Sequence, residues 1–168
     1  SWSGGSVSYA GARDLIGRIQ KVFMQIGLQP GARVALLSAN RADSWCSGVA
    51  AQLARLSVTS LHPLGSLDDQ LFQIEDSETQ VLVVDADTFR DRGGELAARA
   101  SNLKHVFTLG PAGYGVDLLA ALEAAGSANP RNFAGADDIA TLNYTGGTTG
   151  RSKGALRYHR EYSGFANA

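Results

Sequence analysis

Cysteine, net charge and long apolar runs are all scarce in this sequence. Cys46 is the single cysteine among 168 residues, which excludes an internal disulfide and a zinc site built from several cysteines. Lys and Arg total 15 against 16 Asp and Glu, so the charge balance does not suggest a nucleic-acid partner. The longest aliphatic runs, VALL from Val34 and VLVV from Val81, are far shorter than the roughly 20 residues of a membrane helix.

The opening residues, SWSGGSVSYA, also lack the charged and apolar segments of an export signal. With 44% apolar and 18% charged residues, the chain has enough apolar side chains for a core. These features together predict a soluble globular domain in a reducing, cytoplasmic setting.

Two apolar patterns alternate along the chain. Helical spacing predicts helices near residues 10–26, 43–55, 67–76, 96–100 and 116–125. Short apolar runs predict strands at 34–37, 58–61, 81–84, 106–109 and 139–144, with a further strand at 154–158. This alternation predicts an α/β fold with a mostly parallel sheet flanked by helices, and the composition of residues 126–135 predicts a surface loop.

Individual residues in the predicted helices also have expected positions. Asp43 or Ser44 is expected to cap the second helix, and Ser66 the third. Trp45 is expected in the core, and Cys46 is expected to be a small packed residue rather than a nucleophile.

The segment after residues 139–144 is the most unusual in the chain. Residues 145–154, TGGTTGRSKG, combine four glycines with three threonines and one lysine. Glycines let the backbone approach a ligand closely and turn its N–H groups inward, while the hydroxyls and the ammonium add donors, so this composition suits phosphate oxygens. A plain glycine turn between two strands is the structural alternative, although such a turn does not need the hydroxyls and the lysine together.

Two other nucleotide motifs do not match. The pattern G-x-x-x-x-G-K-[ST] fails because Ser152 occupies the second glycine position and Gly154 follows Lys153. The dinucleotide pattern G-x-G-x-x-G fails because Leu118 stands where a glycine is required after Gly113 and Gly115.

Residues 144–154, YTGGTTGRSKG, resemble the phosphate loop of the adenylate-forming superfamily, usually written YTSGTTGxPKG. Nine of the eleven positions agree, with x counted as free. Three upstream segments fit the same family in order: SYAGARDLI from Ser8, GLQPGARVALLSANRADSW from Gly27, and LHPLGSLDDQLFQIEDSETQVLVVD from Leu61. The resemblance covers nearly the whole chain, and among the subfamilies the sequence is similar in character to fatty-acid and other acyl-CoA ligases.

The resemblance implies two half-reactions. A carboxylate attacks the α-phosphorus of ATP and expels pyrophosphate, and a thiol, commonly that of coenzyme A, then captures the acyl-adenylate. Because ATP carries about four negative charges, Mg²⁺ is expected to neutralise most of what one lysine cannot. The resemblance assigns phosphate binding to Thr145, Gly146, Gly147, Thr148, Thr149, Gly150 and Lys153.

Two positions depart from the family pattern. Gly146 replaces a serine, which removes a hydroxyl, and Ser152 replaces a proline, which would have fixed φ before the lysine. Both changes predict weaker or slower nucleotide capture, with the lysine charge retained.

Family members continue beyond this loop into adenine-binding, magnesium-binding and acyl-pocket segments and a mobile C-terminal domain. The resemblance therefore implies that residues 1–168 are a partial N-terminal domain of an AMP-dependent ligase for a carboxylic acid, in the first instance a fatty acid. The chain alone is expected to be inactive and to self-associate through surface meant for the missing part. The alternative is a non-catalytic nucleotide-binding or scaffold module of the same fold.

The remaining candidate residues have simpler interpretations. His159 matches a histidine often found after the family's loop, and a substrate-site role and a structural role at a helix start both stay open. His62 and His105 are expected to be structural, and no metal ligand is assigned. Asp85, Asp87 and Asp91 follow a strand end where catalytic acids occur, but are expected to be solvated loop carboxylates that cap the next segment.

Overall fold

The computed structural model describes residues 6–145 and 152–166. The helices are α1 (Tyr9–Gln25), α2 (Ala42–Leu53), α3 (Leu67–Asp76), α4 (Ala86–Arg99), α5 (Leu118–Ala125) and α6 (His159–Ala166). The strands are β1 (Arg33–Leu37), β2 (Ser57–Ser60), β3 (Val81–Asp85), β4 (His105–Leu109), β5 (Val116–Asp117), β6 (Ile139–Thr145) and β7 (Lys153–Tyr158). They form one sheet in the order β5-β4-β3-β1-β2-β6-β7, parallel except for the β6–β7 pair. The predicted, mostly parallel α/β architecture is confirmed.

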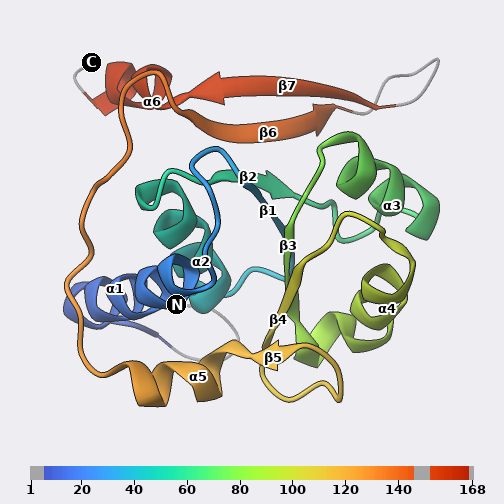
Figure 1. The fold of residues 1–168 in the computed structure, drawn as a ribbon, viewed down its shortest axis with the longest axis horizontal. Coiled ribbons are helices and arrows are strands. Elements are labelled where there is room, and N and C mark those ends of the chain that lie inside the picture. The colour runs from blue at the N-terminus through green and yellow to red at the C-terminus, as the bar shows by residue number, and fades with distance from the viewer. Residues whose placement is uncertain (1–5, 146–151, 167–168) are drawn as a thin grey trace.

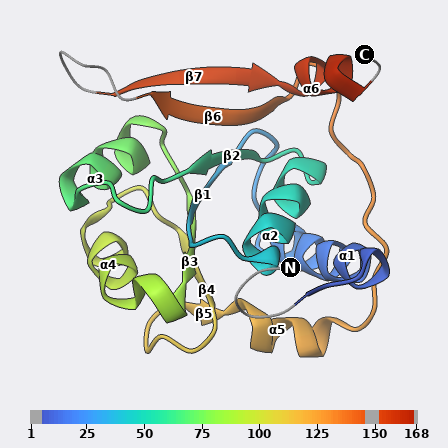
Figure 2. The same ribbon diagram turned by 180° about the vertical axis from the view of Figure 1, so that it is seen from behind.

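The helices lie on both faces of the sheet. Helices α1, α2 and α5 cover one face, and α3 and α4 cover the other (Figures 1 and 2). β3 shows why its apolar run is continuous, because Val81 and Val83 enter the core on the first face while Leu82 and Val84 enter the core on the second. The run of four apolar residues is therefore a strand buried on both sides, as its sequence predicts.

Serine caps fix the starts of two helices. The Ser8 side chain accepts a hydrogen bond from the Gly11 N–H, and the Ser66 side chain accepts one from the Asp69 N–H. Each bond satisfies a backbone donor that the first helical turn leaves free. The predicted cap of α3 is therefore confirmed.

The prediction for α2 is wrong at its start and on its buried face. Arg41 is the N-cap residue and makes no side-chain capping bond, so Asp43 lies inside the helix. Trp45 is 61% exposed. The residues that α2 buries are instead small, among them Cys46, Gly48 and Ala50, and the indole lines a surface hollow that residues of α1 also line. The packed position expected for Cys46 is confirmed, because it is fully buried.

Two other predicted helices differ in extent from the structure. The helix expected at 96–100 is the end of α4, which begins ten residues earlier at Ala86 and has a kink at Phe89. The helix expected at 116–125 begins at Leu118, because Val116 and Asp117 pair with β4 as a short strand and Asp117 then caps α5.

The connection between α5 and β6 runs along the outside of the molecule from one end of the sheet to the other (Figure 1). Gln20 on α1 holds its middle with two hydrogen bonds to the Arg131 backbone, at 2.7 and 2.9 Å. The Phe133 N–H bonds to the Leu53 carbonyl at 2.9 Å. The predicted loop at 126–135 is thus confirmed, and it delivers β6 to the side of β2. No helix within the described residues is long and apolar enough to cross a membrane.

Candidate functional site

The hairpin of β6 and β7 carries the predicted phosphate loop between its strands. Residue pairing runs from Ile139 opposite Tyr158 to Thr145 opposite Lys153. The Thr145 hydroxyl donates a hydrogen bond to the Lys153 carbonyl oxygen at 3.4 Å. The structure therefore brings together the first and the last of the predicted phosphate-binding residues.

The other predicted phosphate-binding residues lie outside the described part of the chain: Gly146, Gly147, Thr148, Thr149 and Gly150. The strands on either side of this segment are described: β6 ends at Thr145 and β7 begins at Lys153. β6 runs parallel to β2, so Thr145 ends at the edge of the sheet where the other parallel strands also end. Ligands of open α/β sheets bind at this edge.

Lys153 is exposed and begins β7. The ion pairs found among residues 6–145 and 152–166 do not include it. An ammonium that no carboxylate of this part of the chain neutralises is available to an anion at this end of the hairpin.

The base of the loop is fastened to α3. The Tyr144 hydroxyl donates a hydrogen bond to the Asp76 carboxylate at 2.5 Å, and its ring meets Phe72 edge-on with centroids 6.3 Å apart. Burial, together with the bond to Asp76, raises the pKa of Tyr144 well above its ordinary value. The hydroxyl therefore stays protonated at neutral pH and remains a donor.

His159 lies at the far end of β7, where α6 begins. The six residues of β7 separate it from the loop by about 20 Å. Its backbone N–H donates to the Asp138 carbonyl at 3.0 Å, and its Nε2 atom is buried without a hydrogen-bond partner among the described residues. The structure thus does not bring His159 to Thr145 and Lys153, and a substrate-site role for it stays a prediction.

Charged side chains that the sequence analysis did not connect meet where β1 and β3 end. Arg41 donates to both carboxylate oxygens of Asp43, at 3.0 and 2.8 Å. It also donates to Asp85 at 2.8 Å and to Asp87 at 2.6 Å. The hydrogen bond to Asp43 is the main cause that raises the pKa of Arg41 above its ordinary value. We call these four residues the Arg41 cluster.

The expectation of solvated loop carboxylates is wrong for Asp85, which is fully buried at the end of β3. Asp87 and Asp91 are exposed as expected, but they lie within α4 and not in a loop. The capping part is confirmed, since Asp85 accepts a hydrogen bond from the Asp87 N–H at 3.1 Å. Sequence spacing hid the Arg41–Asp85 pair because β1 and β3 are neighbours in the sheet although α2, β2 and α3 separate them in the chain. The sequence signal for this ion pair is an arginine shortly after one buried strand and an aspartate at the end of another.

The Arg41 cluster sits at the switch point of the sheet. The order β2-β1-β3-β4-β5 is that of flavodoxin-like folds, which bind ligands between the ends of β1 and β3. Here one cation faces three carboxylates, so these charges bind one another and fasten the start of α2 to the start of α4.

A hollow of about 360 Å³ adjoins the cluster beside β1 and β2. Ser44, Trp45 and Gln52 of α2 line it on one side, and Thr141 of β6 on the other. Its polar side chains other than Arg41 are neutral, so it is suited to uncharged groups. It extends from the switch point to the hairpin.

The two remaining histidines lie at opposite edges of the sheet. His62 follows the end of β2, whereas His105 begins β4, and the two strands run in the same direction. The structure therefore does not bring them together. No group of three His, Cys, Asp or Glu side chains suited to a metal ion occurs among the described residues.

The chain matches a known protein family over its whole length. The family is described as AMP-binding enzyme, and the match covers residues 1–168. The medium/long-chain-fatty-acid–CoA ligase FadD8 of Mycobacterium tuberculosis is 32% identical over 150 residues, which are 85% of this chain and 26% of that protein. The 2-succinylbenzoate–CoA ligase of Bacillus velezensis is 32% identical over 146 residues, which are 87% of this chain and 26% of that protein. The chain thus spans about a quarter of the length of these curated relatives.

Solved structures share the fold. ATP-bound MatB from Rhodopseudomonas palustris superimposes with a TM-score of 0.78 and 32% identity, over 98% of this chain and 32% of that one. The amide bond synthetase McbA from Marinactinospora thermotolerans gives a TM-score of 0.83 with 25% identity, over 98% of this chain and 31% of that one. The fold described above therefore recurs in proteins about three times as long.

Proposed function

The chain belongs to the AMP-binding enzyme family, and we propose on that premise that it forms the first part of an ATP-dependent ligase that joins a carboxylic acid to coenzyme A. The observation that carries the proposal is the hairpin, in which Thr145 and Lys153 flank the sequence GGTTGRS at the carboxyl edge of the sheet. An adenylate-forming enzyme must hold the pyrophosphate part of ATP while the α-phosphorus is attacked. A glycine and threonine loop that ends on an exposed lysine suits this task.

We assign phosphate binding to the loop as a unit. Backbone N–H groups and hydroxyls would donate to the β- and γ-phosphate oxygens, and Lys153 would stabilise the charge that develops as pyrophosphate leaves. The residues assigned to this role are Thr145, Gly146, Gly147, Thr148, Thr149, Gly150 and Lys153.

Magnesium is proposed to accompany ATP. When bound, the ion would offset charge on the phosphate oxygens. Because residues 6–145 and 152–166 do not gather three metal-binding side chains, we assign none of them as a magnesium ligand.

Within the carboxylic acids, we propose a fatty acid as the substrate. The similarity to FadD8 supports this choice. The chain is equally identical, at 32%, to a 2-succinylbenzoate–CoA ligase, so aromatic acids are the competing class of substrate. Rates of acyl-CoA formation by the complete enzyme with matched fatty and aromatic acids decide between them. A preference for the aromatic acids would refute the fatty-acid assignment.

Residues 1–168 are proposed to be a partial N-terminal domain that does not complete the reaction alone. The share of about a quarter of the relatives' length supports this division. We further propose a cytoplasmic location, which the single buried thiol of Cys46 fits, and self-association of the isolated chain. A monomer in light scattering at high concentration would refute self-association, and acyl-CoA formation by the purified chain would refute its inactivity.

The main experiment removes the loop's donors in the complete enzyme. Replacing Thr148, Thr149 and Lys153 together by alanine is expected to slow acid-dependent ATP–pyrophosphate exchange by about 100-fold or more. Lys104→Ala is the matched control, because Lys104 precedes β4 at the opposite edge of the sheet and should leave the rate within about twofold.

Three outcomes separate the hypotheses. A large loss in the triple variant alone supports the ligase. Normal exchange in the triple variant refutes the assignment of the loop. ATP binding without exchange, for every acid tried, supports the non-catalytic module instead.

A further inference from the structure

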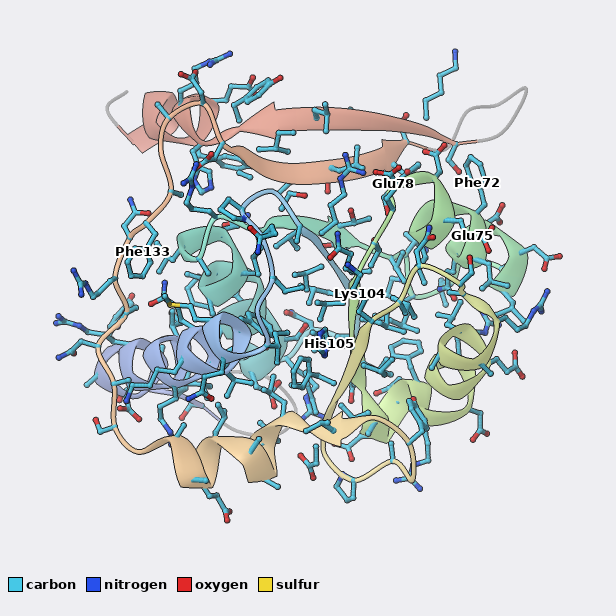
Figure 3. All side chains as sticks on the ribbon, in the orientation of Figure 1. Phe72, Glu75, Glu78, Lys104, His105 and Phe133 are labelled. Atoms are coloured by element: carbon cyan, nitrogen blue, oxygen red, sulfur yellow. The ribbon has the colours of Figure 1, made fainter. Side chains whose placement is uncertain are left out.

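The Tyr144 side chain joins the hairpin to a helix far away in sequence. Its hydroxyl reaches Asp76 at the end of α3, 68 positions earlier in the chain, at 2.5 Å. Its ring lies against Phe72, one helical turn before Asp76. Figure 3 shows Phe72 on α3 beside the end of the hairpin that carries the loop. The two contacts tie the base of the loop to α3.

A side chain at the position opposite Tyr144 would have to displace Leu142. Tyr144 pairs with Gly154 across the hairpin. A Cβ atom on Gly154 would lie 2.7 Å from the Leu142 Cδ1 atom and 3.5 Å from the Tyr144 Cζ atom. The tyrosine ring therefore lies close to the backbone of the opposite strand at Gly154.

The direction of the Tyr144 side chain determines that of Thr145, because successive residues of a strand point to opposite faces. The Tyr144 side chain is directed to α3, so the side chain of Thr145 is directed to the other face of the hairpin. Fixing Tyr144 therefore fixes the face on which Thr145 and its partner Lys153 present their donors.

We infer that Tyr144, which packs beside Gly154 and bonds to Asp76, is the positioning residue of Thr145 and Lys153, the two residues that flank the loop segment. This inference rests on the proposed function for its catalytic meaning, although the mechanical claim concerns the chain alone. α3 holds the tyrosine, the tyrosine holds the pair of Thr145 and Lys153, and these two residues meet ATP with their donors already oriented. Preorganised donors bind a polyanion without a further ordering cost.

The mechanical claim is tested by amide hydrogen exchange of the chain, measured by NMR. Tyr144→Phe keeps the ring and removes the hydroxyl, and Asp76→Ala removes the acceptor. Each variant is expected to speed exchange at the Thr145 and Lys153 amides by about tenfold, since a hydrogen bond to a charged group is lost. Combining the two changes should add little, because both remove the same bond.

The matched control is Tyr158→Phe at the other end of the hairpin, where Arg160 lies over the tyrosine ring. Exchange at Thr145 and Lys153 should stay unchanged in this variant. Unchanged exchange of the β1 and β3 amides in all variants shows that the fold is intact. Wild-type exchange at Thr145 and Lys153 in Tyr144→Phe would overturn the inference.

The catalytic claim is tested in the complete enzyme. Tyr144→Phe is expected to raise KM for ATP by about tenfold and to leave kcat within about twofold, since a bond that only orders the loop acts on binding. An unchanged KM for ATP would overturn the catalytic part. If the wild-type enzyme lacks ATP-dependent activity altogether, the proposed function fails, while the exchange result still decides the role of Tyr144.

Discussion

Replacing Arg41 is expected to lower the free energy of unfolding substantially, because Arg41 is the single cation of the Arg41 cluster. Its side chain is 15% exposed, and its partner Asp85 is fully buried. Arg41→Met retains most of the apolar volume and leaves the Asp85 carboxylate buried without its cation. Removing one partner of a buried ion pair costs about 3–5 kcal/mol. Asp85 keeps two backbone donors, the N–H groups of Ala39 and Asp87, which places the expected loss near the lower limit, at about 3 kcal/mol.

The assay is urea unfolding of the chain at pH 7, followed by circular dichroism. Asp87→Asn is the matched control, because Asp87 bonds to the same guanidinium but its side chain is 74% exposed. That variant should cost less than about 1 kcal/mol, as exposed ion pairs do. Adding Asp85→Asn to Arg41→Met should restore part of the lost stability, since the uncompensated charge is then removed. Equal small losses for Arg41→Met and Asp87→Asn would refute the view that Asp85 depends on Arg41.

Three further predictions concern packing, burial and the loop sequence. Gly17→Ala should lower the free energy of unfolding by about 1–3 kcal/mol, because a Cβ atom at position 17 would clash with the Ala128 carbonyl. Gly135→Ala is the control, since a Cβ atom has space there, and it should change the free energy of unfolding by less than about 0.5 kcal/mol. Equal urea midpoints for the two variants would contradict this prediction. Burial raises the pKa of the Cys46 thiol to about 11, so at pH 8 only about one thiol in a thousand is ionised. Ellman's reagent should therefore react slowly with Cys46 until urea unfolds the chain. Rapid reaction of the folded chain would show that the thiol is accessible. Gly146→Ser together with Ser152→Pro restores the residues of the family pattern and should tighten ATP binding, measured by calorimetry. An affinity for ATP equal to that of the unchanged sequence would contradict the prediction that these two residues weaken nucleotide binding.

The sheet was predictable because its strands bury both faces. A run such as residues 81–84 offers the same apolar pattern to either side, and local sequence suffices to recognise it. α4 was largely missed for the opposite reason. Its inward face carries Ala86, Gly93 and Leu96 as buried residues, so the apolar stripe is sparse, and the kink at Phe89 breaks its periodicity.

The site divides in the same way. The loop between Tyr144 and Gly154 was visible because its chemistry is concentrated in consecutive residues. The bond from Tyr144 to Asp76 and the pair Arg41–Asp85 were not visible, because each joins segments that only the order of the strands makes neighbours. Trp45 shows that spacing alone does not decide burial, since the residues of α2 that face the core are small and the indole is exposed.

The hairpin joins the rest of the sheet by few paired backbone positions but also by buried side chains. β6 meets β2 at the single register pair Val58–Thr141, whereas β1 matches β3 at four positions. Ala140 and Leu142 of β6 are nevertheless buried, so the hairpin contributes side chains to the interior. Exchanging the hairpin for that of a relative would therefore require position 144 to stay tyrosine, to meet Asp76, and positions 140 and 142 to stay apolar, to fit the interior beneath them.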